Sequence, residues 1–185
     1  MQERAEKANA LAKSKAPEQS GDGGAAATGT PGEYASDGYA ISFPTEWKAY
    51  PNPNAKSVTV VPDNGIVKTH DGKQSMARGM IAGYFEVESN RLSNATDELI
   101  ESFQQSNPGM QPIRGQRRNV RLAGESAQSI LLSAPSVIEN TEEVVWIVTA
   151  LRPQGLFHLV MVAPDNEYNQ LRNTFQDTVN KLEWK

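Results

Sequence analysis

Four strand-like segments follow one another in the second half of the chain, with no helix between them. They are Arg117–Leu122, Ser126–Ala134, Glu143–Leu151 and Leu156–Ala163. Strands joined by short turns pair antiparallel, because a parallel pair needs a long crossover connection. The last two segments are apolar at nearly every position, a pattern typical of central strands covered on both faces. This part of the sequence therefore predicts an antiparallel sheet whose centre is buried on both sides.

Two helices and several earlier strands complete the pattern. A helix is predicted over Asn94–Gln105, where Asn94 can cap the first turn and apolar residues recur at helical spacing. A second helix begins at a capping Asp165 and carries its large apolar residues on one face. Earlier strands are predicted at Tyr39–Phe43, Ser57–Val61 and Met76–Val87. This order of elements predicts the α+β class, an antiparallel β-sheet with flanking helices.

The first part of the chain differs from the rest in composition. Residues 1–37 contain one aromatic residue, Tyr34, and no Ile, Val or Phe, which is too little apolar surface to offset ordering entropy. Residues 2–15 predict a short Ala-rich helix, and the Gly-rich stretch after Pro17 predicts a flexible linker. We therefore divide the chain into a helical or disordered N-terminal arm, 1–37, and one α+β domain, 38–185.

The composition argues against several classes of partner. The formal net charge is −4 and the sequence pI is near 5.3, whereas a general nucleic-acid binder needs Lys and Arg to neutralise phosphates. No stretch of the sequence approaches the ~20 consecutive apolar residues of a membrane span, so membrane insertion is not expected. Cysteine is absent, which excludes disulfides, a thiolate nucleophile and a Cys-based metal site in this chain.

The sequence contains no recognisable catalytic motif. The two histidines, His70 and His158, lie in different predicted elements, and we assign them a surface role and a core role in preference to a shared metal. The chain has no nucleophile elbow and no phosphate-binding glycine loop that opens a helix. Glu142 and Glu143 precede a strand, where exposed acids are ordinary. We therefore expect no enzyme activity, no metal site and no cofactor.

Two groups of residues are candidates for binding. Arg117 and Arg121 share one face of a predicted strand, with Arg118 on the other. They are either the footprint of an anionic partner or a means of protecting an exposed strand from edge pairing, and the second interpretation is preferred. The aromatic residues could line a pocket or fill the core, and the core is preferred. They are Trp47, Tyr50, Tyr84 and Phe85.

Several stretches resemble a known family. The stretch Ile41-Ser42-Phe43-Pro44-x-x-Trp47 resembles the opening of the PsbP-like fold, which the photosystem-II extrinsic protein PsbP shares with a Ran-binding nuclear import factor. More closely, the chain resembles the C-terminal accessory domain of acidobacterial-type HtpX/Ste-type zinc metallopeptidases. That resemblance covers residues 38–185 and includes Pro62–Gly65, Ser106–Met110 and Leu151–Leu156.

The resemblance implies a PsbP-like α/β/α sandwich and a particular class of function. The H-E-x-x-H helix of the peptidase is absent, so no catalytic residue carries over. What the resemblance implies is an appended, non-catalytic module in the periplasm or cell envelope, which binds a metallopeptidase domain or its substrate. The alternative hypothesis is a small-ligand carrier, with an apolar pocket lined by Trp47, Tyr84 and Phe85.

Overall fold

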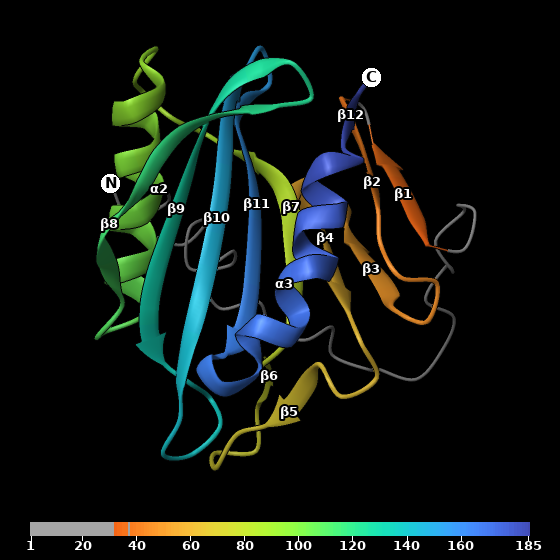
Figure 1. The fold of residues 1–185 in the computed structure, drawn as a ribbon, viewed down its shortest axis with the longest axis vertical. Coiled ribbons are helices and arrows are strands. Elements are labelled where there is room, and N and C mark those ends of the chain that lie inside the picture. The colour runs from red at the N-terminus through yellow and green to blue at the C-terminus, as the bar shows by residue number, and fades with distance from the viewer. Residues whose placement is uncertain (1–31, 37) are drawn as a thin grey trace.

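The structure, a computed structural model, describes residues 32–36 and 38–185 (Figure 1). The described helices are α2 (Leu92–Ser106), α3 (Asp165–Asn180) and a short 3-10 helix, η1 (Pro53–Ala55). The described strands are β1 (Glu33–Ser36), β2 (Tyr39–Ser42), β3 (Lys48–Asn52), β4 (Ser57–Val61), β5 (Ile66–Lys68), β6 (Gln74–Met76), β7 (Gly79–Phe85), β8 (Gln111–Leu122), β9 (Glu125–Pro135), β10 (Glu142–Arg152), β11 (Gly155–Pro164) and β12 (Glu183–Trp184).

Seven strands form one large sheet in the order β3-β4-β7-β11-β10-β9-β8. Every neighbouring pair in it is antiparallel. The long hairpins β8–β9, β9–β10 and β10–β11 follow directly from the short turns between them. Their register sets Thr149 of β10 opposite Gln128 of β9 and His158 of β11. The predicted α+β class with an antiparallel sheet is confirmed.

The large sheet is covered on both faces. Along β11, Phe157 and Leu159 contribute to one core, and Leu156 and Val160 contribute to the other. Helix α3 covers the first face together with the small sheet β1-β2-β12, and α2 covers the second. Figure 1 shows α3 crossing in front of the large sheet, with β1, β2 and β12 beside it and α2 at the opposite edge. This layering is why β10 and β11 are apolar at nearly every position.

The two described α-helices begin differently from the prediction. Helix α2 starts at Leu92 after an extended Arg91, so Asn94 lies within the first turn and does not cap it. The partly buried Leu92 packs on the core beneath α2, and Thr96 Oγ1 donates to its carbonyl at 2.7 Å. Asp165 is the first residue of α3 and follows Pro164, so it is not the cap either. Neither helix combines the length and the apolar character that crossing a membrane requires.

The strand predicted over Met76–Val87 is in fact two strands. Strand β6 pairs with β5 in a separate two-stranded sheet, whereas β7 lies between β4 and β11 in the large sheet. The chain changes direction between them at Gly79, whose φ is +139°. A Cβ there would lie 2.5 Å from the Val60 carbonyl oxygen, so the position needs glycine.

A strand also lies within the range that the sequence analysis assigned to the arm. Strand β1 pairs antiparallel with β2, opposing Tyr34 to Ile41. The Tyr34 ring lies 6.2 Å from that of Tyr39, measured between centroids, and packs against the core. A single aromatic side chain therefore anchors a segment whose average composition is that of a linker. The helix predicted over 2–15 lies outside the described residues.

Candidate functional site

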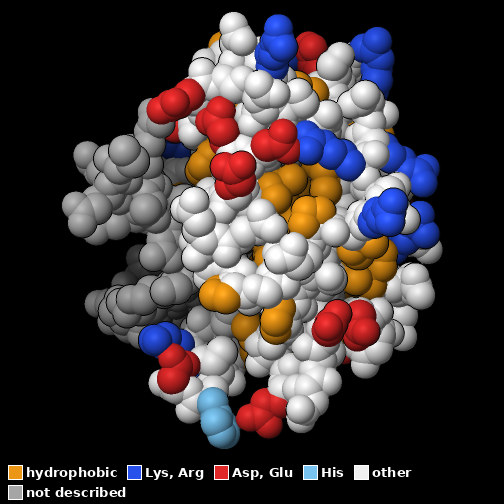
Figure 2. All heavy atoms as spheres, turned by 90° about the vertical axis from the view of Figure 1, so that its left-hand side faces the viewer, with side chains coloured by type: hydrophobic (Ala, Val, Ile, Leu, Met, Phe, Trp, Pro, Cys, Tyr) orange, Lys and Arg blue, Asp and Glu red, His pale blue; other side chains and the backbone are white. Residues whose placement is uncertain are grey.

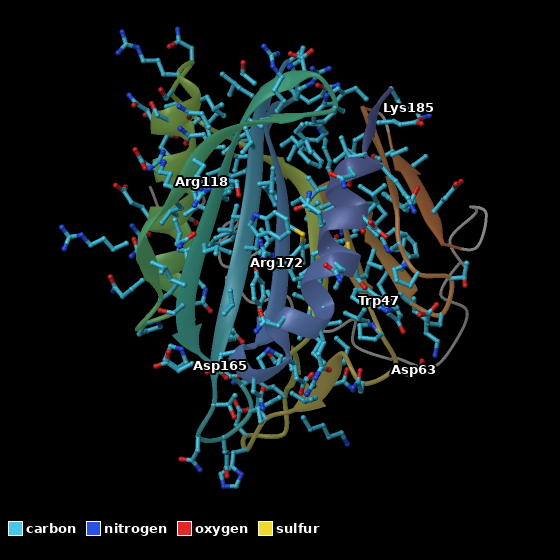
Figure 3. The ribbon with its side chains drawn as sticks, in the orientation of Figure 1. Trp47, Asp63, Arg118, Asp165, Arg172 and Lys185 are labelled. Carbon is cyan, nitrogen blue, oxygen red and sulfur yellow. The ribbon has the colours of Figure 1, made fainter. Side chains whose placement is uncertain are left out.

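Trp47 and Tyr84 lie on the face of the large sheet that α3 covers. Trp47 is 7% exposed and packs edge-on against Phe175 of α3, with 6.3 Å between ring centroids. Tyr84 contacts Tyr39 and Phe157, each at 5.8 Å between ring centroids. Figure 3 shows Trp47 beside α3. These aromatic residues pack with one another and fill the core on this face.

Phe85 lies on the other face of the sheet. It follows Tyr84 in β7, so its side chain points the opposite way and packs with the core beneath α2. The sheet therefore separates Phe85 from Trp47 and Tyr84. The predicted pocket lined by all three residues does not form.

The predicted arginine pair does share a face. Arg117 and Arg121 lie opposite Ile130 and Ser126 of β9 on the α2 side, and Arg118, one residue along from Arg117, points to the other side. Arg121 Nη1 donates to the Gly124 carbonyl oxygen at 2.7 Å, within the β8–β9 turn.

Arg117 connects β8 to its neighbours. Its guanidinium donates to Gln128 Oε1 at 2.7 and 3.1 Å and to the Ser93 carbonyl oxygen at 2.9 Å, and it forms an ion pair with Asp97 of α2. Gln128 in turn donates to Asn119 Oδ1 at 3.1 Å. These contacts hold α2 against β8 and β9, so Arg117 is committed to internal contacts.

Strand β8 forms an open edge of the large sheet. It has 12 residues, of which nine are exposed, and within the described part of the chain no strand pairs with its outer side. The opposite edge, β3, has five residues and contains Pro51, which cannot donate to a further strand. Val120 of β8 is 36% exposed, the one large apolar side chain in the described residues classed as exposed.

Arginines flank Val120 along this edge. Neither Arg114 nor Arg118 forms an ion pair with a described residue. Figure 2, which views the molecule from the edge formed by α2 and β8, shows blue side chains gathered along one border with hydrophobic surface between them. The long edge is therefore both basic and partly apolar, although the whole chain carries a net charge of −4.

A groove lies between β8 and α2. Strand β8 pairs with β9 at Gln111 and Pro112 and again from Arg117 onward, and the register shifts between them, so residues 113–116 form a bulge in the strand. The groove beside it has a volume of about 380 Å³, and Ile100, Ile113 and Arg114 are among its lining residues. Strand β8 thus has a groove lined by both apolar and charged residues on its α2 side, and it has Val120 and Arg118 on the other side.

The environment of Glu143 differs from the one expected from the sequence, because the residue is half-buried. Glu143 is not an ordinary exposed acid, because its Oε2 atom is inaccessible to solvent and has no hydrogen-bond partner. The available signal was its position at the start of a strand predicted to be covered on both faces. His158 is fully buried and the His70 side chain is 99% exposed, as predicted. The described residues contain no cluster of side chains suited to holding a metal ion.

Comparisons with known proteins support the fold. No protein-family model matches the chain, and neither does any curated protein. The solution structure of cyanobacterial PsbP (CyanoP) from Synechocystis sp. PCC 6803 is similar, with a TM-score of 0.58 and 12% sequence identity over 88% of this chain and 98% of that chain.

Two further solved structures are similar. One, from Bacteroides thetaiotaomicron VPI-5482, has a TM-score of 0.52 and 8% identity over 84% of this chain and 49% of that chain. The other is a mutant of the protein Mog1, with a TM-score of 0.52 and 14% identity over 78% of this chain and 89% of that chain. The PsbP-like fold predicted from the sequence is confirmed, and at such identities the likeness extends to the fold alone.

Proposed function

We propose that the protein is a non-catalytic interaction module that binds an extended, acidic segment of a partner protein along β8. The observation that carries this proposal is the 12-residue edge strand, which is exposed along most of its length and carries four arginines. An extended peptide binds such an edge by adding a strand to the sheet, so that main-chain hydrogen bonds supply affinity and side-chain contacts supply specificity.

The geometry of β8 defines what the partner segment must be. Residues Arg117–Leu122 pair regularly with β9, so a partner strand of about six residues fits their outer side. Its side chains would alternate between the α2 side, where Arg121 lies, and the α3 side, where Arg118 and Val120 lie. Carboxylates on the added strand meet these guanidinium groups, and an apolar residue meets Val120.

The same arginines disfavour pairing of two copies of the chain through this edge. Two β8 strands set side by side would bring their arginines together, and like charges directly opposite one another destabilise a strand pair. Protection against self-pairing, which the sequence analysis preferred, therefore agrees with binding an acidic partner. Repulsion between arginines disfavours a second copy of the chain, and attraction to carboxylates favours an acidic segment.

We further propose that the partner is a cell-envelope metallopeptidase domain or its substrate. Support for this finer proposal is the resemblance to the accessory domain of HtpX/Ste-type zinc metallopeptidases, carried by stretches such as Pro62–Gly65 and Ser106–Met110. The same resemblance supports the proposal that the protein is located in the periplasm or cell envelope. The likeness to solved structures supports neither the metallopeptidase partner nor the envelope location, because one fold serves many functions.

Site-specific photo-cross-linking in the organism that makes the protein tests the proposal. A photoreactive residue at Val120 is expected to form one discrete adduct, and the same residue at Arg172, exposed on α3, is the matched control. Figure 3 shows Arg118 and Arg172 on separate elements. Arg118→Glu should abolish the Val120 adduct, and Arg172→Glu should leave it unchanged. Identical adducts from both positions, or an adduct that survives Arg118→Glu, would refute the proposal, and the identity of the adduct tests the metallopeptidase link.

A further inference from the structure

A second concave site, separate from β8, lies beneath the C-terminal end of α2. It is a pocket of about 260 Å³ between α2, the Gln74–Met76 strand β6 and the ends of β9, β10 and β11. Its walls are mainly apolar and include Met76, Phe103, Met110, Val145 and Val160. Its volume lies between that of an engineered cavity that binds benzene, roughly 150 Å³, and the ~300 Å³ of the smallest ligand pockets.

Two polar side chains at well-separated strand positions line the pocket. Glu143 of β10 and His158 of β11 both line it. His158 lies opposite Thr149 in the β10–β11 register, six residues from Glu143 along the same strand. At about 3.4 Å per residue, this spacing separates the two positions by roughly 20 Å of strand. A volume of about 260 Å³ over such a length describes a narrow channel, which suits a linear molecule better than a compact one.

His158 supplies an unmet hydrogen-bonding group to this channel. The side chain is fully buried, and neither Nδ1 nor Nε2 makes a hydrogen bond of good geometry, although the Leu156 backbone lies close enough to oppose part of the effect of burial on the pKa. Burial lowers the pKa of His158 to about 4, so the imidazole is neutral at pH 7. A neutral imidazole offers one donor and one acceptor. Buried polar atoms without partners are uncommon in folded proteins, and each invites an explanation.

Glu143 supplies an unpaired carboxyl group. Its Oε2 is buried without a hydrogen-bond partner, and no described Lys, Arg or His forms an ion pair with it. Burial raises the pKa of Glu143 to about 7. A cation brought close to this carboxylate would offset its desolvation, because buried charges are tolerated when they are paired. The described part of the chain supplies no such cation.

We propose that this pocket binds a linear aliphatic amine, with its ammonium group on Glu143 and its alkyl chain along the apolar walls toward His158. The channel shape, the apolar walls and the unpaired carboxylate each favour this class. A fatty carboxylate would set its negative charge against the ionised Glu143. A hydroxyl at the far end of the chain would reach the unpaired ring nitrogens of His158. This site is distinct from the predicted pocket at Trp47 and from β8.

Calorimetric titration of the full chain tests the site, with butylamine, hexylamine and octylamine as probes. Each added methylene should tighten binding about fourfold, since one buried methylene is worth about 0.8 kcal/mol. Octanoate should not bind, and octanol should bind more weakly than octylamine. Glu143→Gln should remove the preference for octylamine over octanol, and the matched control Glu142→Gln, an exposed neighbour, should retain it.

Three results would overturn the proposal. They are equal binding of octylamine and octanoate, no binding of any amine, or an unchanged amine preference in Glu143→Gln. Val160→Trp, which fills the channel from β11, provides a second variant and should abolish octylamine binding. Circular dichroism and thermal melting of each variant establish that it is folded. None of these results depends on the cross-linking at β8, so the two proposals can fail separately.

Discussion

Replacing Glu143 by Gln should stabilise the fold at neutral pH and leave its stability nearly unchanged in acid. Burial raises the pKa of Glu143 from 4.5 to about 7, so the folded state holds this proton more tightly than the unfolded chain does. Stability therefore falls as pH rises from 4.5 to 7. At about 1.4 kcal/mol per pH unit, the loss reaches about 3 kcal/mol. Gln resembles the protonated acid and cannot ionise, so the Glu143→Gln variant does not lose this stability as pH rises.

His158 contributes the opposite pH dependence. Burial lowers its pKa from 6.5 to about 4, so between these values the unfolded chain binds the proton and the folded state does not. Stability therefore rises with pH across this window, also by about 3 kcal/mol in total. Between pH 4.5 and 6.5 the contributions of Glu143 and His158 nearly cancel in the native protein. In the Glu143→Gln variant, only the contribution of His158 remains, and stability rises with pH.

Urea unfolding of both proteins at several pH values from about 4 to 8 measures this difference. The free energy of unfolding of Glu143→Gln minus that of the native protein should grow from near zero at low pH to about 3 kcal/mol at pH 8. Other titrating groups are common to both proteins and drop out of the subtraction. Glu142→Gln, a change of the same charge at an exposed position, should show no such growth. A difference for Glu143→Gln that stays constant with pH would refute the reasoning.

Three further variants test the packing. Phe175→Ala, which removes a fully buried ring beside Trp47, should cost about 3–5 kcal/mol of unfolding free energy in urea; a cost below about 1 kcal/mol would contradict the burial. Arg78→Ala should destabilise by about 1–2 kcal/mol at pH 7 and by less at pH 3, because Arg78 pairs with Glu167 and lowers its pKa; an equal loss at both pH values would argue against the ion pair. Gly79→Ala, with its Cβ 2.5 Å from a carbonyl oxygen, should lower Tm by at least several degrees, whereas an unchanged Tm would show that the turn relaxes.

The parts of the fold that the sequence predicts are those with local signals. The hairpins of the last four strands follow from short turns such as Pro153–Gly155 between strongly apolar runs. Pairings between distant segments have no such signal. Nothing local indicates that β7 lies between β4 and β11, or that Trp184 near the C-terminus pairs with Tyr39 near the start of the domain.

The same distinction applies to the candidate site residues. Alternation along a strand correctly predicts that Arg117 and Arg121 share a face. The same rule, applied to adjacent residues, places Tyr84 and Phe85 on opposite faces and so excludes their shared pocket. The ion pair of Arg117 with Asp97 joins a strand to a helix that precedes it in the chain. That contact depends on how α2 packs on the sheet, which the sequence pattern does not specify.

The stability measurements and the ligand measurements bear on one another through Glu143. Its ionised form costs the empty fold about 3 kcal/mol at high pH, so folding alone does not account for a carboxylate in this position. An amine bound at Glu143 would stabilise the ionised form and return its pKa toward the ordinary value. Saturating octylamine should then remove the fall in stability between pH 4.5 and 7, in addition to the uniform gain that any ligand of the folded state provides. A uniform gain with the fall intact would place the amine elsewhere on the protein.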